Sequence, residues 1–104
     1  MNNRKRKLAQ AKRQARRDIH RILDAVLDIN GLQGSEEPHP TTFFDFSGHV
    51  GVIEIDFYED GWRAGKFHVT KEAPVHRKPF YKEISLSELA DWLEEERERL
   101  AQVY

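Results

Sequence analysis

An apolar stripe through residues 1–30 constrains the fold more than any other feature of the chain. Its members recur at steps of three and four residues, the spacing of one helix face: Leu8, Ala11, Ala15, Ile19, Ile22, Val26 and Ile29. Gly31 follows the stripe and predicts a left-handed helix terminus. A helix from Leu8 to Asn30 is about 34 Å long, whereas a domain of this size has a radius of gyration near ~13 Å. One end therefore projects, and the alanine-rich first half is the end we expect to be loosely held.

The middle of the chain predicts strands. Residues 31–40 are rich in helix and strand breakers and form a linker. Residues 41–46 read as a strand, 47–48 as a turn and 49–58 as a second strand, in which Ile53, Ile55 and Phe57 share one face. Glu59-Asp60-Gly61 predicts a hairpin turn into a third strand over 62–70. Residues 71–84 read as irregular, with 80–84 as a candidate fourth, edge strand.

A second helix ends the chain. Ser85 and Glu88 match a capping box, in which each side chain accepts from the other residue's free backbone amide. Leucines at helical spacing follow it. The order α-β-β-β-α predicts a single small α+β domain with an antiparallel sheet packed against both helices, and residues 1–18 as a basic arm ahead of a domain over 19–104. We expect Phe44, Phe46, Phe57 and Phe67 to fill its core.

Charge divides the chain end from end. Residues 1–21 hold nine Lys or Arg and one acid, Asp18, a local net charge of +8. Residues 22–104 hold eight Lys or Arg and seventeen acids, a net charge of −9. The overall charge of −1 therefore hides a strongly dipolar molecule.

Both helices carry charge against the helix dipole, because bases open the first and acids crowd the end of the second. Three explanations of this charge placement remain open. In the first, the helices pack antiparallel, so that the basic stretch lies against Glu94–Glu98. In the second, the basic helix binds nucleic acid or a nucleoprotein, and in the third it docks on an acidic protein or on a second copy in a homodimer. We favour nucleic acid, with these binding residues: Arg4, Lys5, Arg6, Lys7, Lys12, Arg13, Arg16 and Arg17.

The acidic surface supports an alternative function. Small inhibitors from phages and mobile elements, including anti-CRISPR-like proteins, imitate the charge of DNA, and this chain shares their size and acidity. Tyr58 and Trp62 flank the predicted hairpin turn beside acids, which suits a protein contact. The alternative is therefore a protein inhibitor or adaptor that acts through its acidic sheet, its hairpin tip and the last helix. Its predicted protein-binding residues are Tyr58, Glu59, Asp60, Trp62, Glu54 and Asp56.

Catalytic and metal motifs are missing from the sequence. Nuclease cores that hold Mg²⁺ place an acid two residues before a strand lysine, but Ala64 stands there before Lys66. The histidines lack zinc-ligand spacing, and there is no cysteine. We therefore expect a non-enzymatic binding protein with no cofactor and no metal. No apolar run reaches the length of a membrane span, and the absence of cysteine suits a cytoplasmic location without membrane contact.

Overall fold

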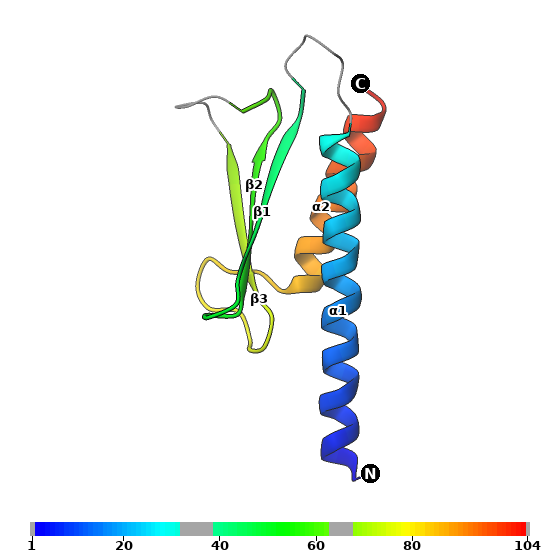
Figure 1. Cartoon of the computed structure of the whole chain (residues 1–104), viewed down its shortest axis with the longest axis vertical. Coiled ribbons are helices and arrows are strands. Elements are labelled where there is room, and N and C mark those ends of the chain that lie inside the picture. Colours follow the sequence, from blue (N-terminus) through cyan, green and yellow to red (C-terminus); the bar gives the residue numbers. More distant parts are fainter. Residues whose placement is uncertain (1, 32–38, 63–67, 104) are drawn as a thin grey trace.

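The computed structural model describes residues 2–31, 39–62 and 68–103. Five elements follow in the order α1 (Asn3–Asn30), β1 (Thr41–Ser47), β2 (Val52–Tyr58), β3 (Val69–Pro74) and α2 (Leu86–Ala101). They form two layers, with both helices against one face of a three-stranded sheet (Figure 1). The predicted α-β-β-β-α order and α+β class are confirmed.

The sheet is an antiparallel meander in the order β1-β2-β3. Ile53, Ile55 and Phe57 are buried and share the helix-facing side, as their alternation predicts. Ile55 pairs with Phe44 on the neighbouring strand β1 and with Lys71 on the neighbouring strand β3. The helix-facing side of the sheet is therefore apolar along β2, and on β3 the Lys71 ammonium lies over the Trp92 ring of α2, 5.1 Å from its centroid.

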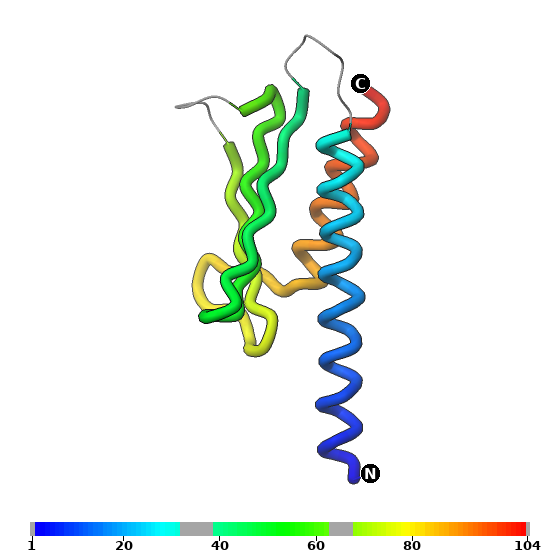
Figure 2. The backbone as a smooth tube through the Cα atoms, viewed as in Figure 1, coloured from blue at the N-terminus to red at the C-terminus, as the bar shows by residue number. Residues whose placement is uncertain are grey.

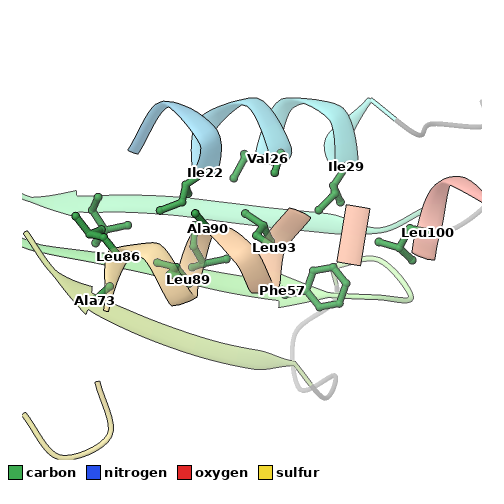
Figure 3. Packing of buried hydrophobic residues seen from close by; sticks show 13 residues of the cluster. Ile22, Val26, Ile29, Phe57, Ala73, Leu86, Leu89, Ala90, Leu93 and Leu100 are labelled. Atoms are coloured by element: carbon green, nitrogen blue, oxygen red, sulfur yellow. The ribbon is translucent and has the colours of Figure 1, made fainter. Parts of the chain in front are cut away.

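The core lies between this side of the sheet and the paired helices (Figure 3). From α1 it takes Ile22, Val26 and Ile29, and from α2 it takes the leucines of its apolar face. Asn30 fastens the end of α1 to β1, because its side-chain amide accepts from the Thr42 backbone N–H at 2.7 Å and donates to the Thr42 carbonyl at 3.0 Å. At the start of α2, the predicted capping box of Ser85 and Glu88 is confirmed.

Several predicted boundaries are wrong. The first helix begins at Asn3 rather than Leu8, because the Asn2 side chain caps it by accepting from the Lys5 backbone N–H at 2.9 Å. Gly31 ends that helix in a right-handed conformation, with φ of −82°, and not in the left-handed one. The first turn is longer than predicted, so β2 begins at Val52 rather than at residue 49.

The third strand also differs from its prediction. Residues 63–67, which include Phe67, lie outside the described residues; among the others, β3 runs from Val69 to Pro74 rather than from 62 to 70. Pro74 is tolerated because β3 is the last strand of the described sheet and Pro74 is its last residue. The candidate fourth strand over 80–84 reduces to a bridge between Glu83 and Glu72. Phe57 is buried and Phe44 partly so, but Phe46 is 43% exposed because it lies near the end of the sheet.

The two helices run in the same direction (Figure 2). Arg21 of α1 contacts Asp91 and Glu94 of α2, and further along both helices Asp28 contacts Arg97 at 3.3 Å. The antiparallel arrangement that would place the basic stretch against Glu94–Glu98 is therefore wrong. The acidic end of α2 lies beside the last turns of α1, at the opposite end of the molecule from the basic N-terminus.

Candidate nucleic-acid interface

The basic half of α1 extends beyond the rest of the molecule. The first buried residue of α1 is Asp18, which is 3% exposed, and the sheet and α2 lie against the helix from about there onward (Figure 1). Asn3 to Ala15 spans about 18 Å of helix. This length explains the elongated shape of the molecule, whose longest extent is 56 Å against 25 and 19 Å.

The exposed bases of α1 gather on one side of the helix. At about 100° per residue, six of them fall within an arc of about 140°, whose centre is about 130° around the helix from the middle of the apolar stripe. We call this set the outward cationic face: Lys5, Arg6, Lys12, Arg13, Arg16 and Arg17. Arg4 and Lys7 lie outside the arc, near the stripe. A helix of this pattern presents a band of positive charge to the side that neither the sheet nor α2 covers.

Arg21 differs from the bases that precede it because it forms ion pairs within the fold. The Arg21 guanidinium donates to Glu94 at 2.6 and 3.1 Å, to Asp91 at 2.5 Å and to the buried Asp18 carboxylate at 3.2 Å. These contacts raise the pKa of Arg21 above its ordinary value and lower that of Glu94. Arg21 therefore serves the α1–α2 contact, and the bases available to a ligand end at Arg17.

None of the eight predicted nucleic-acid-binding bases is paired in this way. Within residues 2–31, 39–62 and 68–103, no carboxylate forms an ion pair with any of the eight cations from Arg4 to Arg17. The Arg17 guanidinium donates to the Gln14 side chain at 3.2 Å, which is a neutral contact. Among the described residues, the charge of this segment is thus uncompensated, while the acids of α2 lie toward the far end.

The predicted protein-binding residues surround the outer, helix-free side of the sheet. Tyr58 stacks against His68 with ring centroids 4.4 Å apart and meets Phe43 edge-on at 5.8 Å. Trp62 is 57% exposed just beyond the Tyr58–Gly61 turn, where Gly61 adopts a φ of 91°. The aromatic part of the predicted patch is thus accessible.

The acids of this patch behave differently from one another. Glu59 forms an ion pair with Arg99, so its carboxylate connects the hairpin to α2 and is not free to bind a partner. Asp56 accepts from the Thr70 hydroxyl at 2.5 Å. Glu54 lies between Asp45 and Glu72 across the strands, and burial together with the charge of its acidic neighbours raises its pKa.

A groove that sequence reasoning missed lies between the basic half of α1 and the sheet. It has a volume of about 800 Å³ and is bounded by the end of β1 and by the segment after β3. Its wall is apolar on both sides, and its rim is basic. The apolar residues are Leu8, Ala11, Ala15, Ile19, Phe46 and Val75, and the basic ones are Lys12, Arg16, His76, Arg77 and Lys78. The weak first half of the apolar stripe was the signal that could have indicated an uncovered face.

The segment after β3 is held in place by charge. Arg77 makes a two-fold contact with Glu83, at 2.7 and 2.9 Å, and its guanidinium lies 4.0 Å from the centroid of the Phe80 ring. The Phe80 backbone N–H also donates to Glu83, and these contacts lower the pKa of Glu83 to about 2. Arg77 is therefore fixed at the groove rim at any pH near neutrality.

Among the residues that the structure describes, no group of three histidine, aspartate or glutamate side chains is arranged to hold a metal ion. Over the same part of the chain, no helix combines the length and apolarity needed to cross a membrane. Comparison with protein-family models, with curated proteins and with solved structures finds no match to this chain.

Proposed function

We propose that this protein binds nucleic acid through the outward cationic face of α1. The observation that carries the proposal is that the cations from Arg4 to Arg17 form no ion pair with the described residues. Arg21, by contrast, forms ion pairs with three carboxylates of the fold. Six cations on one helix face can neutralise several phosphates and release their counterions, which is the main source of affinity in sequence-independent binding.

Shape favours duplex DNA over duplex RNA. An α-helix with its side chains is about 10–12 Å wide, close to the ~12 Å width of the major groove of B-form DNA. The major groove of A-form RNA is too narrow for side chains to read. The projecting helix also keeps the acidic outer side of the sheet and the end of α2 away from the phosphates.

Binding of a labelled DNA duplex, followed by fluorescence anisotropy at several salt concentrations, tests this proposal. If about six phosphates are neutralised, log K falls against log salt with a slope near −5, so affinity drops about 10³-fold between 50 and 200 mM salt. Replacing Arg13 and Arg17 by glutamine makes the slope shallower by about two. Both side chains are exposed, so the fold is expected to persist.

A matched control removes the same charge elsewhere. Lys78 and Lys82 are exposed in the segment after β3, and changing both to glutamine leaves the outward cationic face intact. We expect this variant to keep the wild-type slope to within about half a unit. If both double variants weaken binding equally, net charge and not the α1 face governs binding. If the wild type binds neither DNA nor RNA, the proposed function is wrong.

A second candidate function rests on the outer side of the sheet. The exposed Trp62 and the aromatic contact of Tyr58 with Phe43 support a protein-binding patch beside the acids Glu54 and Asp56. An inhibitor that imitates DNA would use this surface and would act without α1 charge. Retained partner binding after the Arg13 and Arg17 changes, together with its loss in Trp62→Ala, would favour this function over nucleic-acid binding.

A further inference from the structure

We propose that the groove beside α1 is a docking site for an acidic amphipathic helix of a partner protein. The groove lies on the side of α1 that faces the sheet, and Lys12 and Arg16, at the edge of the outward cationic face, line its rim. The apolar walls of the groove are separate from the outward cationic face, so peptide binding there and duplex binding can be measured independently, although Lys12 and Arg16 belong to both surfaces.

The groove leaves apolar surface exposed on both of its walls. Leu8 is 59% exposed on the α1 side, and Phe46 is 43% exposed on the sheet side. Ala11 and Ala15 lie between Leu8 and the body of the domain. A contiguous apolar surface of this kind, rimmed by polar residues, is typical of an interaction site.

The dimensions of the groove suit a helix. From Leu8 to Ile19 the α1 wall spans about 17 Å, which is about three turns. The two alanines allow another backbone to approach closely, and the aliphatic walls suit Leu or Ile side chains projecting at i, i+3 or i+4, and i+7. Nucleic-acid bases would require aromatic platforms instead, and the residues that line this groove include one phenylalanine, Phe46, and one histidine, His76, but no tryptophan or tyrosine.

The charge of the rim indicates what the helix must carry. Lys12 and Arg16 border the α1 side, and Lys78 borders the opposite side; no acid is among the described residues that line the groove. Arg77 is already paired with Glu83, so the unmatched charge comes from the other three. An occupant with acids flanking its apolar face would complement both rims.

A second copy of this chain is a poorer occupant. Packing its α1 into the groove would bring two sets of Lys12 and Arg16 together, and like charges in close contact oppose association. Its acidic helix α2 already uses its apolar face in the core, where Leu89 and Leu93 are fully buried. An acidic amphipathic helix of a partner protein therefore complements the groove better than α1 or α2 of a second copy.

The test uses a labelled synthetic amphipathic peptide of about sixteen residues, with leucines on one face and glutamates on both flanks. A scrambled peptide of the same composition keeps the charge and removes the apolar face. In the full-length protein, Ala15→Glu places an acid in the groove. Gln10→Glu adds the same charge on α1 at a position about 140° away and serves as the matched control.

We expect the amphipathic peptide to bind about tenfold more tightly than the scrambled one, and Ala15→Glu to weaken it about tenfold while Gln10→Glu changes affinity less than about twofold. In NMR spectra of the wild type, the peptide should shift the amide signals of Leu8, Ala15, Phe46 and Val75. The inference would be overturned if both peptides bound equally or neither bound. It would also be overturned if Ala15→Glu left the affinity unchanged, or if a single-stranded oligonucleotide produced these shifts and the peptide did not. Duplex binding in the same samples reports on the proposed function separately.

Discussion

Replacing Arg21 by glutamine should destabilise the fold, because one guanidinium joins α1 to α2. It contacts Glu94 with two nitrogens, Asp91 with one, and the Asp18 carboxylate at 3.2 Å. Asp18 is 3% exposed in the wild type. Without the guanidinium, the remaining side-chain hydrogen bond to Asp18 among the described residues is the one from the Gln14 amide, which is 3.1 Å long in the wild type. Stranding one buried carboxylate costs several kcal/mol in a dry core. The Arg21 side chain is 33% exposed to water, which screens the interaction, so we expect a loss of about 2 kcal/mol.

Urea denaturation followed by tryptophan fluorescence measures this change. Trp92 is partly buried and meets Phe57 edge-on, with ring centroids 5.8 Å apart, so its emission reports unfolding of the core. A loss of about 2 kcal/mol corresponds to a melting temperature lower by about 10 °C for a domain of this size. The double variant D18N/R21Q should recover about 1 kcal/mol, because it also removes the stranded charge.

The effect of R21Q should depend on pH in one direction. Arg21 lowers the pKa of Glu94, so this contribution is fully present above the ordinary carboxyl pKa of about 4.3 and is lost as pH falls through the lower native value. The difference between wild type and variant should therefore shrink at acid pH. A change below about 0.5 kcal/mol at pH 7, or a difference that grows on acidification, would refute the reasoning about Arg21.

Three further predictions concern stability. Glu54→Gln should stabilise the fold by about 0.5 kcal/mol at pH 7 and by less at pH 4. The native pKa of Glu54 is raised, so its ionised form destabilises the fold only above the ordinary carboxyl pKa. Urea titrations at both pH values measure the gain, and a larger gain at pH 4 would contradict the prediction. Ser85→Ala should cost about 1 kcal/mol by removing the capping box, whereas Ser87→Ala, at an exposed position within α2, should cost less than about 0.5 kcal/mol in the same assay. Leu93→Ala should cost about 3 kcal/mol because Leu93 is fully buried, and Leu8→Ala less than about 0.5 kcal/mol; comparable losses would mean that the first half of α1 is packed in solution.

The sequence predicts those parts of the fold that local periodicity determines. Ile53, Ile55 and Phe57 alternate, Ser85 and Glu88 form a capping pair, and Ile22 and Ile29 mark one helix face; all of these are confirmed. Such patterns state which side of an element is buried. They do not state which element covers it.

The features that the sequence does not predict depend on contacts between distant residues. The relative direction of α1 and α2 is decided by the path of the intervening strands, and Arg21 finds Asp91 and Glu94 only when the helices run parallel. The shift of β3 toward Pro74 similarly reflects pairing with Val52 and Ile53, which overrides the breaker at position 74. The groove depends on where the sheet ends relative to α1, which periodicity cannot give.

The most direct test of the central claim is an NMR titration of the isotope-labelled full chain with a short DNA duplex. We predict that the shifted side-chain and amide signals cluster on the outward cationic face, at Lys5, Arg6, Arg13 and Arg17, while the Arg21 guanidinium signals stay in place. They should return as salt is raised, because the contacts are to phosphates. Signals that shift instead around Trp62 and Tyr58, or no shifts at low salt, would contradict the assignment of α1 as a nucleic-acid-binding helix.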